Sequence, residues 1–141
     1  MHQNDLFYLC SLLESLSRTT GLSKSEVINH LGDQAVLHLY KVANVNHCLP
    51  LAQVTEEVIE YHHLPIKEDK VIKQKMKVSV WDAGHIYQRL ILDVSTKDNW
   101  FEKMKEIYHS WICAYLDDYD NVIYWQSRSY IRECYLVGKI L

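Results

Sequence analysis

The scarcity of residues that break helices constrains the fold of this chain more than any other feature. Its 141 residues include four Gly and two Pro. Sandwiches and barrels of β-strands need a turn about every ten residues, and these turns usually carry Gly or Pro. Hydrophobic residues make up 48 % of the chain and charged residues 23 %, which is typical of a folded globular domain and excludes a wholly disordered chain. The composition therefore favours an all-α fold.

Apolar residues recur at helical spacing through the first half of the chain. A first stripe follows Asn4, a candidate N-cap, and ends at Gly21. Ser23 stands three residues before Glu26, which is the spacing of a capping box. This box predicts a second helix, which Gly32 ends.

Two more helices are expected in this half. Asp33 is expected to cap a third helix. A fourth opens at Pro50, because proline fits the first turn of a helix, and it stops before Pro65. The apolar side of this fourth helix is formed by Val54, Val58 and Tyr61.

The second half of the chain repeats the pattern with larger side chains. One helix is expected to begin at Asp82 or Ala83. From 99 to 116 the apolar stripe is the broadest in the chain. We therefore expect one continuous helix there, with Trp111 buried at its centre.

The last part of the chain is expected to hold a loop, a short apolar run and a final helix. The run of acids within 117–121 predicts a loop, since adjacent acids at the end of a helix oppose its dipole. Residues 122–125 fit a strand or an extended plug. The final helix begins at Ser127 or Ser129 and ends at Gly138.

The predicted fold is all-α, with six or seven amphipathic helices in a compact bundle or in two small helical halves. An N-terminal helical half spans 1–66, and an aromatic-rich C-terminal helical half spans 78–141. Both halves are acidic. The lysine-rich segment 67–77 between them is expected to be a basic linker.

Charge and cysteine usage indicate the compartment. The net charge of −3 gives no reason to expect a nucleic-acid binder. The N-terminus lacks the basic and apolar regions of a secretory signal, and no apolar run is long enough to span a membrane. Four cysteines without C-x-x-C spacing are therefore expected to be reduced thiols of a cytoplasmic protein.

No metal centre or cofactor is predicted. The eight histidines form no H-x-x-x-H pattern, and the adjacent His62 and His63 would point about 100° apart on a helix. The acidic loop at 117–121 offers oxygen ligands but lacks the glycine that an EF-hand loop requires. Glycine motifs that bind phosphates or dinucleotides are also missing from the sequence.

One short segment does carry catalytic residue types. Asp82, His85 and Arg89 would share one helix face, where they could transfer protons or bind phosphate. The sequence places no nucleophile in a positioning motif such as G-x-S-x-G. It therefore favours a non-enzymatic role, and a small enzyme or toxin that uses these three residues stays an alternative.

Residues 23–45 support a second alternative. A short capped helix, a turn with glycine and a second helix form the arrangement of a helix-turn-helix, which would make the chain a DNA-binding regulator. The outer face of the second helix offers Gln34, His38 and Lys41, within an acidic half. A helical hairpin that contributes to the core explains the same pattern more simply.

The acidic loop and the residues after it have the composition of a protein-binding surface. Aromatic side chains lie there beside carboxylates and outside any helical stripe. Aromatic anchors rimmed by acids suit a partner that is basic on its contact face. We therefore expect a protein partner rather than a membrane or a nucleic acid. The predicted partner-binding residues are Asp117, Asp118, Tyr119, Asp120, Tyr124 and Trp125.

Residues about 6–62 resemble a known family. The matching stretches read FYLCSLLESLSRTTGLSKSEVINHLGDQAVLHLYKVANVNH and QVTEEVIEY, with GLSKSEV as the strongest part. They resemble a small all-helical bacterial domain family of unknown function, often encoded beside ADP-ribosyltransferase-like proteins. The resemblance implies a non-enzymatic protein-binding module, antitoxin-like or immunity-like, that neutralises or regulates a partner protein.

Overall fold

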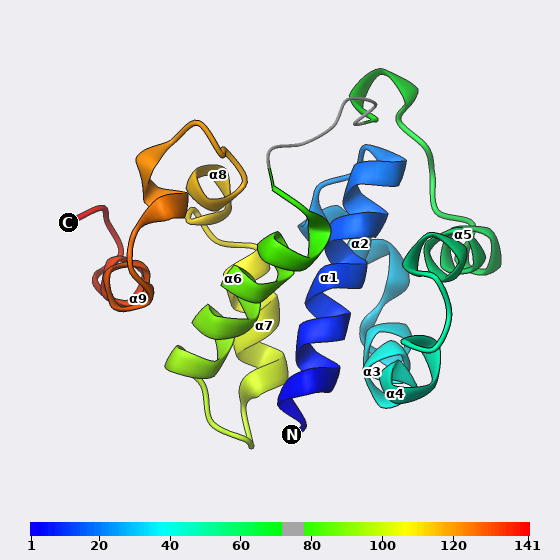
Figure 1. Ribbon diagram of the computed structural model, residues 1–141, viewed down its shortest axis with the longest axis horizontal. Coiled ribbons are helices and arrows are strands. Elements are labelled where there is room, and N and C mark those ends of the chain that lie inside the picture. Colours follow the sequence, from blue (N-terminus) through cyan, green and yellow to red (C-terminus); the bar gives the residue numbers. More distant parts are fainter. Residues whose placement is uncertain (72–77) are drawn as a thin grey trace. The chain divides into compact units, whose positions relative to one another are not determined.

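The computed structural model describes residues 1–71 and 78–141, and 71 % of these described residues are in helices (Figure 1). The prediction of an all-α fold is confirmed. The α-helices are α1 (Gln3–Thr20), α2 (Lys24–Leu31), α3 (Asp33–Lys41), α4 (Ala43–Asn46), α5 (Leu51–His62), α6 (Val80–Val94), α7 (Trp100–Tyr108), α8 (Cys113–Leu116) and α9 (Arg128–Val137). These nine helices of the described residues exceed the six or seven predicted, because α4 and α8 are single turns too short to show a stripe.

The chain divides into two compact units, Met1–His85 and Ile86–Leu141. The division falls inside α6, so this helix contributes residues to both units. The first unit also holds a short 3₁₀ helix at Glu68–Lys70. Part of the predicted linker 67–77 lies outside the described residues, which omit 72–77. The predicted linker and the halves on either side of it stay a prediction.

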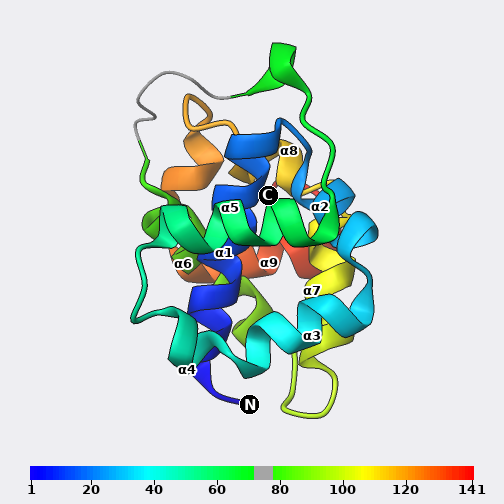
Figure 2. The ribbon, with the colours of Figure 1, turned by 90° about the vertical axis from the view of Figure 1, so that its right-hand side faces the viewer.

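Helix α1 is the centre of the first unit. α2, α3, α4 and α5 each pack against it. Figure 2 shows α5 crossing α1, with α3 and α4 nearer the N-terminal end of α1. Each fully buried leucine contributes about 1.5–3 kcal/mol, so α1 supplies much of the core of this unit. Its leucines without exposed surface are Leu6, Leu9, Leu12, Leu13 and Leu16.

The ends of the first two helices follow the sequence signals closely. Gly21 ends α1 in the left-handed conformation, with φ 78°. The capping box of α2 is present: the Ser23 hydroxyl accepts the backbone N–H of Glu26 at 3.1 Å, and the Glu26 carboxylate accepts that of Ser23 at 3.0 Å. The predicted N-cap at Asn4 is wrong, because α1 begins one residue before it. The predicted cap at Asp33 is also wrong, because Asp33 is the first residue of α3 and Gly32 holds the N-cap position.

A buried ion cluster fastens α2 to α1. Glu14 Oε1 lies 2.7 Å from Lys24 Nζ, and Glu14 Oε2 lies 3.0 Å from Arg18 Nε. The side chains of Glu14 and Lys24 are almost completely buried. Arg18 also donates to the carbonyl of Val78 at 2.9 Å, which extends the cluster to the residues before α6. A buried charge without its partner is strongly destabilising, so the cluster favours one register of α2 on α1.

The Glu14 carboxylate is ionised in this cluster. Burial alone raises the pKa of Glu14, but the charges and hydrogen bonds of Lys24 and then of Arg18 outweigh burial. They hold the pKa below its ordinary value of 4.5. A carboxyl whose pKa is lowered on folding adds stability above its unfolded pKa and loses that contribution as the pH falls through the folded value.

The first part of α6 lies directly against α1. Gly84 permits this approach, because a Cβ at this position would collide with the backbone and hydroxyl of Ser11. The close contact brings Trp81 beside Phe7, with ring centres 5.7 Å apart. The α1–α6 contact thus places aromatic side chains of two helices together on the first unit.

The boundaries of α6 and α9 show how serine caps decide where helices start. α6 begins at Val80, two or three residues before the predicted start, because the Ser79 hydroxyl accepts the backbone N–H of Asp82 at 3.0 Å. α9 follows the cap at Ser127 and ends at Gly138, as the sequence predicts.

The continuous helix predicted over 99–116 is wrong. The chain leaves the helical path between α7 and α8. There the side chains of His109 and Ser110 bond to backbone carbonyls of the preceding turn, and such bonds compete with those of the helix. Trp111 falls in the interruption and is 36 % exposed, so the prediction that it is buried at the centre of a helix is also wrong.

Aromatic side chains form part of the core of the second unit. Tyr87 stacks on Tyr108 with ring centres 4.7 Å apart, and its hydroxyl donates to Asp117 Oδ1 at 2.6 Å. Burial raises the pKa of Tyr87 well above its ordinary value, and the negative charge of Asp117 raises it further. Tyr87 is therefore a neutral hydrogen-bond donor at all ordinary pH values.

Replacing Glu14 by Gln is expected to lower the free energy of unfolding by roughly 3–5 kcal/mol, because it leaves Lys24 buried without a counter-charge. Urea unfolding followed by circular dichroism measures the loss. Glu133→Gln, at an exposed side chain, is the control and should change this free energy by less than about 0.5 kcal/mol.

The pH dependence provides a second test of the same cluster. The difference in stability between the unsubstituted chain and Glu14→Gln should shrink as the pH falls below 4.5, where the carboxylate of the unfolded chain becomes protonated. A difference that is near zero at pH 7, or that stays constant down to pH 3, would contradict this description of the cluster.

Candidate functional site

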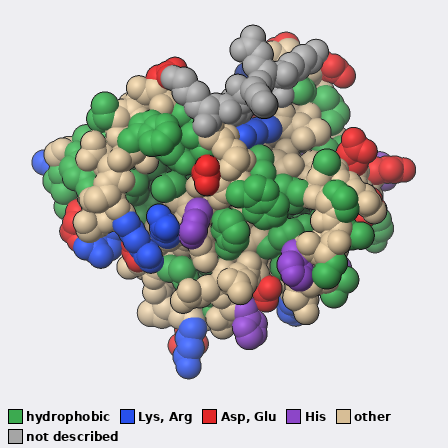
Figure 3. Space-filling view, viewed as in Figure 1, with side chains coloured by type: hydrophobic (Ala, Val, Ile, Leu, Met, Phe, Trp, Pro, Cys, Tyr) green, Lys and Arg blue, Asp and Glu red, His purple; other side chains and the backbone are tan. Residues whose placement is uncertain are grey.

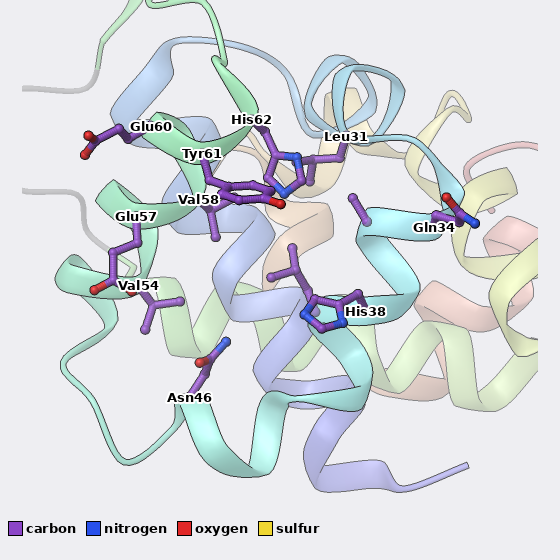
Figure 4. A pocket seen from close by; sticks show the side chains of 12 residues that line it. Leu31, Gln34, His38, Asn46, Val54, Glu57, Val58, Glu60, Tyr61 and His62 are labelled. Carbon is purple, nitrogen blue, oxygen red and sulfur yellow. The ribbon is translucent and has the colours of Figure 1, made fainter.

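A wide groove lies between α3 and α5 (Figure 4). Both helices pack against α1, and in the described part of the chain they make little contact with each other. The groove has a volume of about 1100 Å³. Sites for small molecules usually measure roughly 300–1,000 Å³. The groove lies at the upper end of that range, and its open form suits a segment of a macromolecule.

The floor of the groove is apolar. Leu39 of α3 and Val54 and Val58 of α5 line it and are themselves buried. Leu31 and Ala35 extend this apolar surface along α2 and α3. The buried floor side chains have little surface left in water, so the apolar surface that a partner could cover here belongs mainly to Ala35 and Tyr61. Covering apolar surface is worth about 25 cal/mol per Å² before the costs of association.

Tyr61 supplies an exposed aromatic anchor at the groove. It is 80 % exposed, and its ring extends from α5 toward the space between the two helices (Figure 4). The ring meets that of His62 edge to face, with centres 4.9 Å apart. The sequence places Tyr61 on the same helix side as Val54 and Val58, and all three do line one surface. Exposed tyrosines of this kind are frequent hot spots of protein interfaces.

The α5 edge of the groove is acidic. Glu57 and Glu60 of α5 belong to the lining, and their carboxylates are directed away from α3, toward the outer side of this edge (Figure 4). Gln53 Nε2 donates to Glu57 Oε1 at 3.0 Å. None of the described residues that line the groove is Lys or Arg. An apolar floor with an uncompensated acidic edge favours a cationic, amphipathic partner segment. The remaining polar side chains of the lining are Gln34, His38, Asn46 and His62.

The aromatic anchors predicted in the second unit are only partly exposed. Tyr119 and Tyr124 are buried and pack edge to face, with ring centres 5.0 Å apart. Residues Val122–Trp125 form a 3₁₀ helix rather than the strand or extended plug predicted. Trp125 is 61 % exposed, and its indole N–H donates to the carbonyl of Tyr119 at 2.9 Å. Of these three aromatic residues, Trp125 is therefore the one that a partner could reach.

The acids of the same loop have local contacts. Asp117 accepts the hydroxyl of Tyr87, as described above. Asp118 Oδ1 accepts the backbone N–H of Asp120 at 3.1 Å, and Asp120 is exposed. These contacts stabilise the loop, and a role of the loop in partner binding stays a prediction.

The residues of the catalytic alternative all lie on α6. Asp82 is exposed in the first turn, and the ring of His85 packs on Phe7 with centres 5.0 Å apart. Arg89 lines a cavity of about 40 Å³ together with Arg128. That volume is small beside the roughly 300–1,000 Å³ of usual small-molecule sites. A catalytic role for these residues stays a prediction.

Helices α2 and α3 pack against each other as the predicted hairpin over 23–45. Lys24 is buried in the ion cluster, so it is not available to a phosphate backbone. Gln34 and His38 line the groove. The exposed side of α3 thus forms a wall of the groove, and DNA binding by this hairpin stays a prediction.

Within residues 1–71 and 78–141, no group of three or more His, Cys, Asp and Glu side chains is placed to hold a metal ion. The helices of those residues also include none that is both long and apolar enough to cross a membrane.

Comparison of the chain with known protein families, curated proteins and solved structures finds no match.

Sequence reasoning missed this groove. The sequence does predict the apolar side of α5. The spacing of apolar residues along one helix does not show that α3 and α5 pack on α1 without packing closely against each other. One signal was present: Tyr61 closely follows Glu57 and Glu60. The loop at 117–121 has the same pairing of an aromatic side chain with acids.

Substitutions at two neighbouring positions test which aromatic side chains of the second unit contribute to the stability of its core. Tyr124→Ala should lower the free energy of unfolding by roughly 3–5 kcal/mol, because it empties a buried site. Trp125→Ala should cost about 1 kcal/mol, since most of its surface is already in water. Thermal and urea unfolding measure both. Equal losses for the two variants would mean that Trp125 is part of the core.

Proposed function

We propose that this chain is a non-enzymatic module that binds a protein partner in the groove between α3 and α5, and thereby neutralises or regulates it. The observation that carries the proposal is the combination of an apolar floor, an exposed tyrosine and an acidic edge on one surface. Apolar burial would supply affinity, and the carboxylates would select the partner by charge.

The occupant we propose is an amphipathic helix of the partner that carries Lys or Arg beside an apolar stripe. Such helices lay their apolar face into grooves through residues at i, i+3, i+4 and i+7. Leu39, Val54 and Val58 would receive that stripe. Glu57 and Glu60 would face the basic side chains, and Tyr61 would cover the helix from the side.

The resemblance of residues about 6–62 to the bacterial helical family adds a biological context to this proposal. The antitoxin-like or immunity-like role that the family implies requires a surface that binds another protein tightly. The groove lies wholly within the stretch that carries the resemblance. A toxin-like partner that is basic on its contact face fits both lines of argument.

A pair of designed peptides tests the chemistry of the groove without knowledge of the natural partner. The first is a fluorescein-labelled helical peptide with Leu at groove-facing positions and Lys elsewhere; the second replaces every Lys by Glu. Fluorescence anisotropy should show saturable binding of the Leu/Lys peptide and much weaker binding of the Leu/Glu peptide. Added salt should weaken the Leu/Lys complex, because screening reduces attraction between exposed charges.

Tyr61→Ala should weaken binding of the Leu/Lys peptide by about 2 kcal/mol, a factor of roughly thirty, while leaving the melting temperature nearly unchanged. Trp125→Ala is the matched control, since it removes another exposed aromatic side chain outside the groove. The double variant Glu57→Lys/Glu60→Lys should also weaken binding. Glu56→Lys, on the same helix but outside the groove lining, should have a smaller effect.

Two results would overturn the proposal. Equal affinity for the Leu/Lys and Leu/Glu peptides would show that charge does not select the occupant. Loss of binding in Trp125→Ala but not in Tyr61→Ala would move the partner surface to the loop at 117–125, as the sequence first indicated.

A further inference from the structure

A second cavity of the first unit lies apart from the groove residues. It measures about 430 Å³, which is within the usual range for a small ligand. Phe7 and Tyr8 of α1, Trp81 of α6 and the segment around Asn44 and His47 line it. Figure 3 shows hydrophobic side chains exposed over α1 and the start of α6, beside histidine and acidic side chains.

Three aromatic rings form the apolar part of this cavity. Trp81 lies 5.7 Å from Phe7 and 6.2 Å from Tyr8 between ring centres, and the planes are tilted by 48° and 53°. Tilted rings of this kind can meet a ligand from more than one side. Trp81 is 41 % exposed, so its ring is accessible from water. The face of a tryptophan ring attracts cations more strongly than that of any other side chain.

The lining holds one acidic side chain and one histidine, His47, whose Nδ1 lies 2.7 Å from the carbonyl oxygen of Asn44. Asp5 lines the cavity, and no Lys or Arg is among the lining residues of the described chain. Within the described residues Asp5 also makes no ion pair. The first turn of α1 carries the positive end of a helix dipole, and the Asp5 carboxylate offsets it. The cavity therefore favours a cation over an anion.

Tyr8 contributes an independent observation. It is 4 % exposed, and within the described residues its hydroxyl is buried without a hydrogen-bond partner. Leaving a buried hydroxyl unpaired costs free energy, so such groups usually have a partner or a function. Because Tyr8 lines the cavity, a ligand with N–H donors could supply the missing bond.

We infer that this cavity binds a guanidinium group. A guanidinium is planar, stacks on aromatic faces and carries five N–H donors, so it offers a stacking contact to Trp81, a counter-charge to Asp5 and a donor to the Tyr8 hydroxyl. A quaternary ammonium would gain the aromatic contact but has no N–H for Tyr8 or Asp5. The site goes beyond the proposed function, since it shares no lining residue with the groove.

The indole N–H signal of Trp81 in ¹H–¹⁵N NMR spectra reports binding directly, and its absence from Trp81→Phe assigns it. The probes are L-argininamide, tetramethylammonium and acetate. Argininamide should shift the Trp81 signal saturably, with a dissociation constant on the order of 1 mM for one desolvated cation–π contact and its hydrogen bonds. The indole signals of the other three tryptophans are internal controls.

Tyr8→Phe separates the hydrogen bond from the aromatic contact. It removes an unpaired buried hydroxyl, so it should not lower the melting temperature. It should weaken argininamide binding about tenfold and leave tetramethylammonium binding unchanged. Asp5→Asn should also weaken argininamide binding, while Asp69→Asn, an exposed acid outside the cavity, should not.

The source of the guanidinium can be distinguished in the same assay. A capped Gly-Arg-Gly peptide that binds more tightly than argininamide indicates an arginine side chain of a partner, and weaker binding indicates a free guanidinium compound. The inference is overturned if argininamide gives no saturable shift, if tetramethylammonium binds as tightly, or if acetate shifts the signal. Failure of the Leu/Lys peptide, which contains no guanidinium, leaves this result unaffected.

Discussion

The ion cluster of Glu14, Lys24 and Arg18 is the interaction on which the first unit depends. Each of these charges would be costly alone, so the cluster is favourable only where all three meet. It joins α2 to α1 and, through the Val78 carbonyl, also fixes the residues just before α6. A shift of α2 along α1 would separate the buried charges of Lys24 and Glu14, which is strongly destabilising.

Both proposed binding surfaces follow from this arrangement around α1. With α1 occupied along its length, α3 and α5 pack on it separately and leave the acidic groove between them. The start of α6 is held close to α1 where Gly84 lies against Ser11, which places Trp81 next to Phe7 and Tyr8. The core therefore determines where the exposed aromatic side chains of this unit lie, and the acids beside them determine which partner charge they attract.

Local signals in the sequence predicted the local structure well. They did not predict features that depend on the packing of residues distant in the sequence. The capping box at Ser23, the glycine ends at Gly21 and Gly138 and the all-α fold could be identified, because each depends on neighbouring residues. The prediction of one continuous helix over 99–116 was wrong. The apolar stripe there does not reveal that the side chains of His109 and Ser110 bond to backbone carbonyls where the helix is interrupted. The groove could not be predicted, because it depends on the distance between α3 and α5 rather than on either helix.

The most direct test of the account is to locate the Leu/Lys peptide on the ¹⁵N-labelled protein by backbone amide shifts. The account predicts that the largest changes lie in α3 and α5, centred on Leu39, Val58 and Tyr61, with the amides of 117–125 unchanged. Changes confined to 117–125, or spread evenly over the exposed acids of both units, would contradict the claim that the groove is the partner-binding surface.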